Sequence, residues 1–470
     1  MISTPRRVAV VGGGVSGLTA AYRLCRADPA LEVTVLEASN RAGGKLRSVP
    51  VGDLSLPAGA DSFLARKPWA VELCSELGIA AELDAPGTTG AYLWTDGGLA
   101  PFAKDAPFGI PGDVGDVFRW PGLSRAGRRR AAQDLVRTKR KDPGDETLGA
   151  LLRRRLGDEA TDRAVAPLLA GLFAGDIDRL SVQATFPELA RWEASQGSLI
   201  RGAQAATRDA RRGRDPGPMF LRPRAGVERL TDALADRLDP RCVRTGTRVT
   251  GIGVHDRGYV VHIGTIDALL VDAVILAPEA PVAAELVRAI APGAAAELVG
   301  IPYASTGVVL AVYGEGTARD LPAGTGFVVP RGRAPMTAST WLSNKWPSAA
   351  FGSRAVIRSY VGAVGEEDVL EAGDAELIEA CARFQAAVVP LPAMPQDAAV
   401  VRWSRSMPQY ELGHVERVAR VRDQLPAGIF VTGQAYDGVG IPDCVRGAGI
   451  TAEAVLTYVT HVSRQEETVP

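Results

Sequence analysis

Cysteine is scarce in this chain, and the spacing of the cysteines excludes the common metal and redox sites. The five cysteines, Cys25, Cys74, Cys242, Cys381 and Cys444, form no Cys-x-x-Cys pair and no cluster with the four histidines. A zinc site or a redox-active dithiol is therefore not expected, and no metal is predicted. An odd, dispersed set of cysteines is typical of proteins from a reducing compartment.

Long apolar runs and an excess of charge of one sign are also lacking. No stretch of about 18 uncharged apolar residues occurs, so no membrane-spanning helix is predicted. The first predicted strand begins too early to leave room for a signal peptide, and the expected location is the cytoplasm. The net charge of −1 argues against nucleic-acid binding. A length of 470 residues predicts two to three domains.

Glycine, in contrast, is plentiful and is concentrated after the first apolar run. Residues 7–11 (RVAVV) predict a buried parallel strand, and residues 12–17 (GGGVSG) match the pattern G-x-G-x-x-G before a helical stretch. A second predicted strand, residues 32–36, ends at Glu37, whose carboxylate would accept hydrogen bonds from a ribose. This order predicts a dinucleotide-binding turn, although a glycine-rich turn without a ligand is the plainer interpretation.

Each glycine of this turn has a separate physical role. Gly12 permits the tight turn, Gly14 lets a pyrophosphate approach the backbone, and Gly17 lets the helix pack closely on the strand. The N-terminus of the helix offers free N–H groups to the phosphates. Arg41, followed by Gly43 and Gly44, suggests a second close-approach loop, which suits FAD better than NAD. Ordinary solvated loop charges remain the alternative for Arg41 and Lys45.

Basic residues gather in the middle of the chain. Between Arg119 and Arg155, twelve Arg or Lys residues stand against four Asp or Glu. The clusters at 128–130, 139–141 and 153–155 fall within helical patterns. A solvated helical face is the plainer interpretation; an anionic membrane surface or an anionic partner is the sharper one. Few aromatic residues occur there, which argues against a nucleic-acid partner.

Several later motifs follow one another along the chain. They are residues 151–159 (LLRRRLGDE), 171–176 (GLFAGD), 324–330 (GTGFVVP), 340–347 (TWLSNKWP), 407–414 (MPQYELGH) and 433–444 (GQAYDGVGIPDC). In this order they resemble the FAD-dependent porphyrinogen oxidases of haem synthesis, which are the protoporphyrinogen oxidases and the coproporphyrin-forming coproporphyrinogen III oxidases of Gram-positive bacteria. The N-terminal glycines alone would not separate this family from the amine oxidases.

The resemblance implies an α/β fold of the amine oxidase superfamily, with a GxGxxG dinucleotide-binding domain, an inserted mixed-sheet substrate domain and a helical domain. The expected boundaries are 1–90, 216–295 and 399–470 for the FAD-binding parts, 91–105 and 296–398 for the substrate domain, and 106–215 for the basic helical domain. It also implies noncovalent FAD, O2 as electron acceptor, and a porphyrinogen as substrate. A membrane or a haem-pathway partner could bind the basic helical region.

Positions carried over from the family give the expected site residues. The residues expected to contact FAD are Gly12, Gly13, Gly14, Val15, Ser16, Gly17, Glu37, Ala38, Arg41, Gly43, Gly44, Lys45, Gly59, Ala60, Asp61, Ser62, Val249, Trp403, Gly440, Ile441, Pro442 and Asp443. The backbone carbonyl of Gly171 would orient the pyrrole N–H groups of the substrate, and Arg66 and Lys67 would bind its propionates. A turn glycine and two solvated cations are the plainer interpretations.

The implied reaction is the six-electron oxidation of coproporphyrinogen III to coproporphyrin III, in three hydride transfers to flavin N5 with release of hydrogen peroxide. Protoporphyrinogen IX is the alternative substrate; an amine oxidase and a noncatalytic carrier on the same fold are further alternatives. The family often has arginine where this chain has Ala363. His414 and Cys444 are expected to be structural, because a lone histidine or cysteine usually is.

The motif at 433–444 would close the cofactor site. Gly438 and Gly440 would let the loop lie against the isoalloxazine ring, and Pro442 suits the first turn of a helix. The N–H groups of Asp443 and Cys444 would face the N1–C2=O edge of the flavin, where negative charge grows on reduction.

Overall fold

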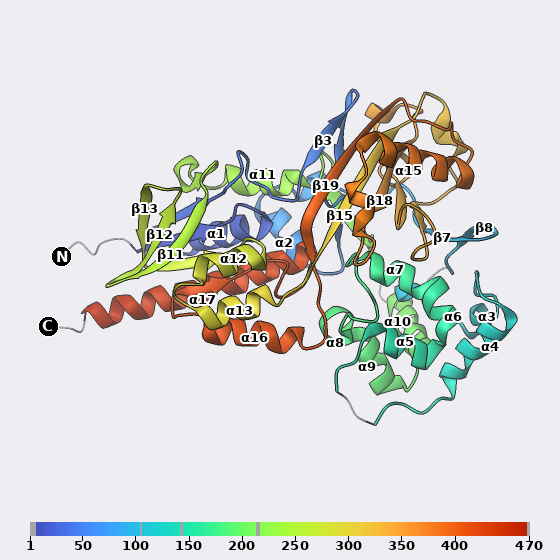
Figure 1. Ribbon diagram of the computed structural model, residues 1–470, viewed down its shortest axis with the longest axis horizontal. Coiled ribbons are helices and arrows are strands. Elements are labelled where there is room, and N and C mark those ends of the chain that lie inside the picture. Colours follow the sequence, from blue (N-terminus) through green and yellow to red (C-terminus); the bar gives the residue numbers. More distant parts are fainter. Residues whose placement is uncertain (1–5, 104–105, 142–143, 213–216, 468–470) are drawn as a thin grey trace.

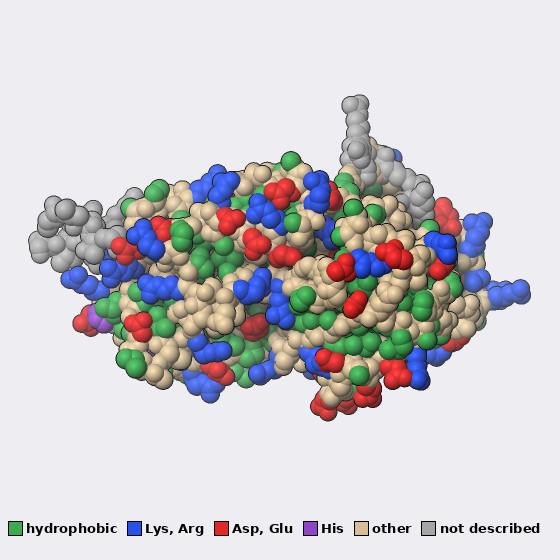
Figure 2. Space-filling model, turned by 90° about the horizontal axis from the view of Figure 1, so that it is seen from above, with side chains coloured by type: hydrophobic (Ala, Val, Ile, Leu, Met, Phe, Trp, Pro, Cys, Tyr) green, Lys and Arg blue, Asp and Glu red, His purple; other side chains and the backbone are tan. Residues whose placement is uncertain are grey.

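Two sheet-bearing regions and one helical region make up the protein, as seen in a computed structural model that describes residues 6–103, 106–141, 144–212 and 217–467. In Figure 1 the first sheet and both chain ends lie at the left, the second sheet at the upper right and the helical region at the lower right. Figure 2 shows Lys/Arg and Asp/Glu side chains interspersed over one face, which agrees with the small net charge.

The first sheet is parallel and has five strands in the order β10-β2-β1-β14-β20. Its strands are β1 (Arg7–Val11), β2 (Glu32–Leu36), β10 (Val243–Arg244), β14 (Ala273–Leu276) and β20 (Ile429–Val431). The strands predicted at 7–11 and 32–36 are confirmed. Alternate residues of β1 enter two different cores: Val8 and Val10 face one, and Ala9 and Val11 face the other. A parallel sheet buried on both faces explains why these strands are apolar without alternation.

Helices cover both faces of this sheet (Figure 1). One core contains residues of α1 (Val15–Ala27), α2 (Trp69–Glu76), α11 (Glu228–Asp236) and the long α17 (Ile441–Glu467). The other contains residues of α12 (Ala280–Val287), α13 (Pro292–Val299), α16 (His414–Gln424) and an antiparallel sheet of β11 (Val249–His255), β12 (Gly258–Ile263) and β13 (Asp267–Val271). The helix predicted after the glycine-rich turn is confirmed.

The second large sheet is mixed and has seven strands in the order β19-β15-β18-β17-β16-β7-β8. Its strands are β7 (Tyr92–Thr95), β8 (Gly98–Pro101), β15 (Tyr303–Val312), β16 (Gly326–Val328), β17 (Ala338–Trp341), β18 (Val356–Val361) and β19 (Asp397–Pro408). All neighbours are antiparallel except β16 and β7. Helices α14 (Leu342–Lys345) and α15 (Asp374–Val388) accompany it.

Short strands connect the two large sheets. The hairpin of β3 (Ser48–Val51) and β4 (Leu54–Pro57) precedes a small sheet in which β9 (Phe220–Pro223) pairs with both β5 (Phe63–Leu64) and β6 (Leu83–Asp84). The helical region contains α3 (Val114–Val117), α4 (Arg125–Ala132), α5 (Leu148–Leu156), α6 (Asp158–Ala160), a π-helical turn (Thr161–Val165), α7 (Ala166–Gly171), α8 (Val182–Thr185), α9 (Pro187–Gln196) and α10 (Leu199–Arg212).

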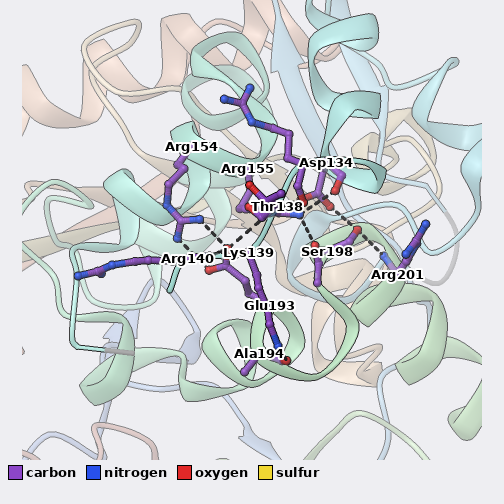
Figure 3. Close-up of polar contacts among 12 residues, drawn as sticks. Asp134, Thr138, Lys139, Arg140, Arg154, Arg155, Glu193, Ala194, Ser198 and Arg201 are labelled. Carbon is purple, nitrogen blue, oxygen red and sulfur yellow. Dashed lines mark hydrogen bonds and ion pairs between the residues drawn. The ribbon is translucent and has the colours of Figure 1, made fainter. Parts of the chain in front are cut away.

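A buried ion pair holds the helical region together (Figure 3). The guanidinium of Arg155 and the carboxylate of Asp134 are both almost fully buried, and Arg155 Nε donates a hydrogen bond to Asp134 Oδ1. The other carboxylate oxygen, Oδ2, accepts from Ser198 Oγ and from the Ile200 N–H at 2.9 Å. Arg155 also donates to the Asp134 carbonyl at 2.7 Å. One ionic centre therefore ties α5 to the segment after α4 and to the start of α10.

The interpretation of residues 153–155 as a solvated basic face is wrong for Arg154 and Arg155. Arg155 is buried. Arg154, whose side chain is 30% exposed, donates to both Glu193 and Glu146, so its charge is paired within the fold. Arg130 donates to the carbonyl oxygens of residues 153–155 at 2.9–3.1 Å, which caps the C-terminal end of α5. Arg130, Arg154 and Arg155 therefore stabilise the helical region through contacts within it.

No helix within the described residues combines the length and the apolar run that crossing a bilayer requires. The same residues contain no group of three or more His, Cys, Asp or Glu side chains that could hold a metal ion.

Candidate functional site

The glycine-rich turn between β1 and α1 leaves space on one side and none on the other. Gly12 has a φ of +100°, and a Cβ added to Gly17 would lie 1.9 Å from the Gly12 carbonyl oxygen. A Cβ added to Gly14 would meet no atom within 4 Å. Gly17 is therefore required for packing the helix on the strand, whereas Gly14 faces open space where a ligand can approach the backbone.

The start of α1 is suited to an anion. Its N-cap, Gly14, has no side chain to accept from the first N–H groups, and its first turn contains no acidic residue. Nearby, Glu37 lies at the end of β2, and its Oε2 accepts from the Gly13 N–H at 2.7 Å. The Glu37 Oε1 accepts from the N–H and the hydroxyl of Ser39. Glu37 is thus fixed beside the turn, as a ribose-binding acid must be.

A second loop packs against the first. The Gly43 N–H donates to the Gly13 carbonyl at 2.7 Å. The Arg41 guanidinium donates to the carbonyls of Gly44 and Leu46, at 3.3 and 3.1 Å, so it holds the loop itself. A Cβ on Gly59 would lie 1.8 Å from the Lys45 carbonyl oxygen. The three glycine-containing segments therefore meet in one place.

Lys45 connects this loop to the second sheet and to a residue that the sequence did not point out. Its Nζ donates to the Ser406 carbonyl at 2.7 Å and lies 3.1 Å from Glu279 Oε1. Burial opposes the negative charge of Glu279, but Lys45 outweighs it, so the pKa of Glu279 is lowered. Glu279 follows β14 at the carboxyl edge of the parallel sheet, where ligands of such folds bind. That position is the signal by which it could have been found.

Asp61 turns its side chain away from the glycine-rich turn. Its carboxylate accepts from Lys345 Nζ at 2.9 Å and from Trp346 Nε1 at 3.1 Å. Burial alone would raise the pKa of Asp61, but the charges of Lys345 and Arg358 hold it well below its usual range. The side chain of Asp61 therefore links the loop to the second sheet, and only its backbone remains available to a cofactor.

The loop that contains Asp61 is held by further hydrogen bonds, one of them from Trp403 of the second sheet. Ser62 Oγ donates to Asp61, and Trp403 Nε1 donates to the Ala58 carbonyl at 3.0 Å. The Arg47 guanidinium lies over the Trp403 ring, 4.7 Å from its centroid. The Thr247 N–H donates to the Glu37 carbonyl at 2.8 Å, so the chain leading to the buried Val249 passes beside Glu37.

One expectation for the motif at 433–444 is confirmed and another is wrong, whereas its contact with a flavin stays a prediction. Helix α17 begins at Ile441, so Pro442 does stand in the first turn. The Cys444 N–H, however, donates to the Gly440 carbonyl at 2.9 Å as an ordinary helical bond. The expectation that this N–H faces a flavin is therefore wrong, because helix formation already uses the donor.

The two cations expected to bind propionates, Arg66 and Lys67, differ in whether their charge is paired. Lys67 Nζ donates to both carboxylate oxygens of Asp443, at 2.7 and 2.6 Å. The Arg66 guanidinium is exposed and lies 6.0 Å from the centroid of the Phe108 ring. Lys67 thus joins the loop after β5 to the start of α17, and its charge is neutralised by Asp443.

Gly171 opens onto a cavity between the helical region and the seven-stranded sheet. The cavity has a volume of about 720 Å³, and Ala363 lies on its wall as well. A Cβ on Gly171 would meet nothing within 4 Å. Within the described part of the chain, the Gly171 carbonyl accepts a long bond of 3.4 Å from the Ala174 N–H. The volume is within the range of sites for small molecules.

Residues 15–456 match the family described as flavin containing amine oxidoreductase. The chain belongs to this family. It is 32% identical over 466 residues to a Bacillus subtilis (strain 168) protein named coproporphyrinogen III oxidase, covering 97% of this chain and 98% of the relative. A Mycobacterium bovis protein of the same name is 34% identical over 461 residues, covering 96% and 98%. A solved structure from Exiguobacterium sp. 255-15 has a TM-score of 0.85 and 31% identity, covering 96% of this chain and 98% of that one.

Membership in the flavin-containing amine oxidoreductases implies a flavin cofactor and confirms the fold expected from the sequence. The open side of Gly14 and the uncapped start of α1 fit the phosphates of a dinucleotide. The roles of the individual site residues stay predictions.

One buried histidine of this oxidoreductase lies near the motif at 433–444. The ring of His414 stacks on Tyr410, with centroids 3.9 Å apart, and its Nε2 has no hydrogen-bond partner within the described residues. Burial, and then the charge of Arg417, lowers the pKa of His414 to about 4. The imidazole is therefore neutral inside the fold at neutral pH.

This neutral histidine predicts a pH-dependent stability. Between about pH 6.5 and about pH 4 the unfolded chain binds a proton at His414 that the folded protein does not. The free energy of unfolding is therefore expected to fall by about 1.4 kcal/mol per pH unit as the pH drops through this window. Urea unfolding should show that the free energy of unfolding of His414→Gln falls less steeply with pH in this window than that of the wild type. Above about pH 7 the two proteins should show the same pH dependence. An equal slope in both proteins would contradict the assignment.

Proposed function

We propose that this protein oxidises coproporphyrinogen III to coproporphyrin III with O2 as the electron acceptor, using noncovalently bound FAD. The observation that carries the proposal is the similarity, along nearly the whole chain, to two proteins named coproporphyrinogen III oxidase. The reaction removes six electrons and six hydrogens from the substrate. Three O2 molecules accept them and leave as three molecules of hydrogen peroxide.

The chain's own residues would hold and orient the reactants. FAD, when bound, supplies the two-electron acceptor that three successive oxidations require. The turn at Gly14 and the start of α1 would bind its phosphates, and Glu37 its ribose. The cavity at Gly171 would exclude water from the macrocycle, and the Gly171 carbonyl, which is weakly engaged, would accept from a pyrrole N–H.

Noncovalent attachment is supported by the state of the nearest thiol. Cys444 is buried at the start of α17, and burial raises its pKa to about 11. A covalent flavin link would require a reactive thiolate, which this environment disfavours. Denaturation is expected to release the flavin into the supernatant, whereas a flavin that stays with the chain would contradict this part of the proposal.

Purified protein assayed separately with coproporphyrinogen III and protoporphyrinogen IX tests the function. Porphyrin fluorescence should rise faster with coproporphyrinogen III, with three hydrogen peroxide molecules per porphyrin. A clear preference for protoporphyrinogen IX would overturn the choice of substrate. Peroxide formation with amines would indicate an amine oxidase, and a colourless protein would indicate a noncatalytic carrier.

We also propose that the helical region contacts an anionic membrane surface. Phe118 and Val136, with exposed fractions of 53% and 82%, belong to the same region as the exposed cations Arg125 and Arg129. Apolar side chains among basic ones favour anionic lipid headgroups. A haem-pathway protein is the other partner that such a surface could bind.

Flotation with vesicles of anionic lipid tests this contact. The double variant Arg125→Glu/Arg129→Glu is expected to lose most of the vesicle-bound fraction, because each basic residue contributes about 1 kcal/mol near such a surface. Arg128 and Arg130 are unsuitable, since both donate to backbone carbonyls. Arg257→Glu/Arg288→Glu, exposed positions of the first sheet region, is the matched control. No flotation of the wild-type protein would favour a protein partner.

A further inference from the structure

Arginines from two different regions line the cavity at Gly171. Arg153 and Arg163 come from the helical region, and Arg331 and Arg333 come from the loop between β16 and β17. The same wall contains acidic side chains. These are Asp96, Asp162, Asp176, Asp178 and Glu366. The four cations therefore differ in how much of their charge remains available to a ligand.

Two of the arginines are paired with acids at hydrogen-bond distance. Arg153 lies in contact with Asp178 and donates to Asp162 at 2.8 Å. Arg333 donates to Asp96 at the turn between β7 and β8. A ligand carboxylate would have to displace these partners, so neither arginine is well suited to receive it.

Arg331 is held in place but keeps donors available. Its guanidinium donates to the Val364 carbonyl. It lies 3.4 Å from Asp176 and 3.5 Å from Glu366, distances beyond those of well-formed charged hydrogen bonds. The side chain is 47% exposed. Three anchors thus fix the position of the guanidinium without satisfying all five of its N–H groups.

Arg163 has the weakest pairing of the four. It lies on the π-helical turn, 3.8 Å from Glu159, and is 57% exposed. The Glu159 carboxylate already accepts from the N–H and the hydroxyl of Ser124. Glu159 therefore has other donors, and Arg163 retains most of its capacity for a new anion.

We propose that Arg163 and Arg331 bind carboxylate groups of the substrate from the two sides of this cavity, one from the helical region and one from the seven-stranded sheet. This inference rests on the proposed function, because it assigns recognition of a polycarboxylate tetrapyrrole to the cavity that contains Gly171. Arginine pairs with a carboxylate through two parallel hydrogen bonds, which also orients the ligand. Arg331 and Arg163 take the role that Lys67, bound to Asp443, cannot perform.

The same assignment accounts for Ala363. This residue lines the cavity next to Val364, and Arg331 donates to Val364 from the neighbouring loop. Arg331 therefore brings a guanidinium to the chain segment where Ala363 provides none.

Binding of coproporphyrin III and of its tetramethyl ester to the flavin-loaded protein tests the proposal. Arg163→Gln and Arg331→Gln should each weaken binding of the acid about tenfold to a hundredfold, since one charged hydrogen bond contributes about 1.5–3 kcal/mol. Binding of the ester, which has no carboxylate, should be unchanged. Arg319→Gln, an exposed arginine outside the cavity lining, is the matched control and should bind both ligands as the wild type does.

Two results of the binding assay would overturn the inference. One is unchanged acid binding in both variants, and the other is equal loss of acid and ester, which would indicate a general disturbance of the cavity. In turnover, KM for coproporphyrinogen III should rise in both variants while kcat changes little. If the wild-type protein binds the acid through these arginines but oxidises no porphyrinogen, the proposed function is wrong and the inference stands. If both variants turn over coproporphyrinogen III with an unchanged KM, the inference is wrong and the proposed function stands.

Discussion

Asp134→Ala is expected to lower the free energy of unfolding by about 3–5 kcal/mol. The substitution leaves the buried guanidinium of Arg155 without its carboxylate. It also removes the acceptor of Ser198 Oγ and of the Ile200 N–H. An unpaired buried charge costs far more than the pair contributes. The nearby Glu193 carboxylate lies 3.5 Å from Arg155 Nη1 and already accepts from Arg154, so it compensates for the lost Asp134 only in part. Chemical denaturation followed by circular dichroism gives the measurement.

The double variant Asp134→Ala/Arg155→Met distinguishes an unpaired charge from lost packing. Because it removes both charges, it should recover much of the stability that the single variant loses. Arg383→Ala breaks the exposed pair with Glu379 and should cost less than about 1 kcal/mol. A single variant no less stable than Arg383→Ala would show that the network of Figure 3 does not stabilise the fold.

Gly14→Ala is expected to weaken flavin binding by about tenfold to a hundredfold while leaving the flavin-free protein as stable as the wild type. The alanine methyl group meets no protein atom within 4 Å, and the φ of Gly14, −76°, is ordinary for alanine. The only group it can obstruct is a ligand at the start of α1. Loss of one charged hydrogen bond to a phosphate costs about 1.5–3 kcal/mol.

Gly17→Ala provides the contrast. Its methyl group would lie 1.9 Å from the Gly12 carbonyl oxygen, so both flavin content and stability of the flavin-free protein should fall. The flavin-to-protein absorbance ratio and thermal unfolding of the flavin-free proteins separate the two effects. Undiminished flavin affinity in Gly14→Ala would mean that the cofactor does not approach this turn.

The parts of the fold that sequence predicted best are those set by local pattern. The apolar run before Gly12, the spacing to Glu37 and Pro442 after Gly440 each determine a structure within a few residues, and each was found where expected. Arg155 could also have been recognised. It shares a helical face with Leu148, Leu151 and Leu152, a spacing that places it in the core.

Pairings between distant segments could not be predicted in this way. Lys67 meets Asp443, and Asp61 meets Lys345, across hundreds of residues. No local periodicity encodes such a pair, since it depends on how the sheets pack. For the same reason the sequence could not show that Lys67 is paired with Asp443, or that Arg163 and Arg331 line one cavity with Gly171.

The strand order of the first sheet has a consequence for synthesis on the ribosome. β20 pairs with β14 at the edge, and α17 packs on α1, although about 400 residues separate the two ends of this arrangement. A nascent chain that has emerged only as far as β19 already contains the glycine-rich turn but lacks the segment 433–444 that faces it. If this segment closes the flavin site, as the sequence predicts, flavin would be retained only once translation is nearly finished, and flavin content would distinguish complete chains from truncated ones.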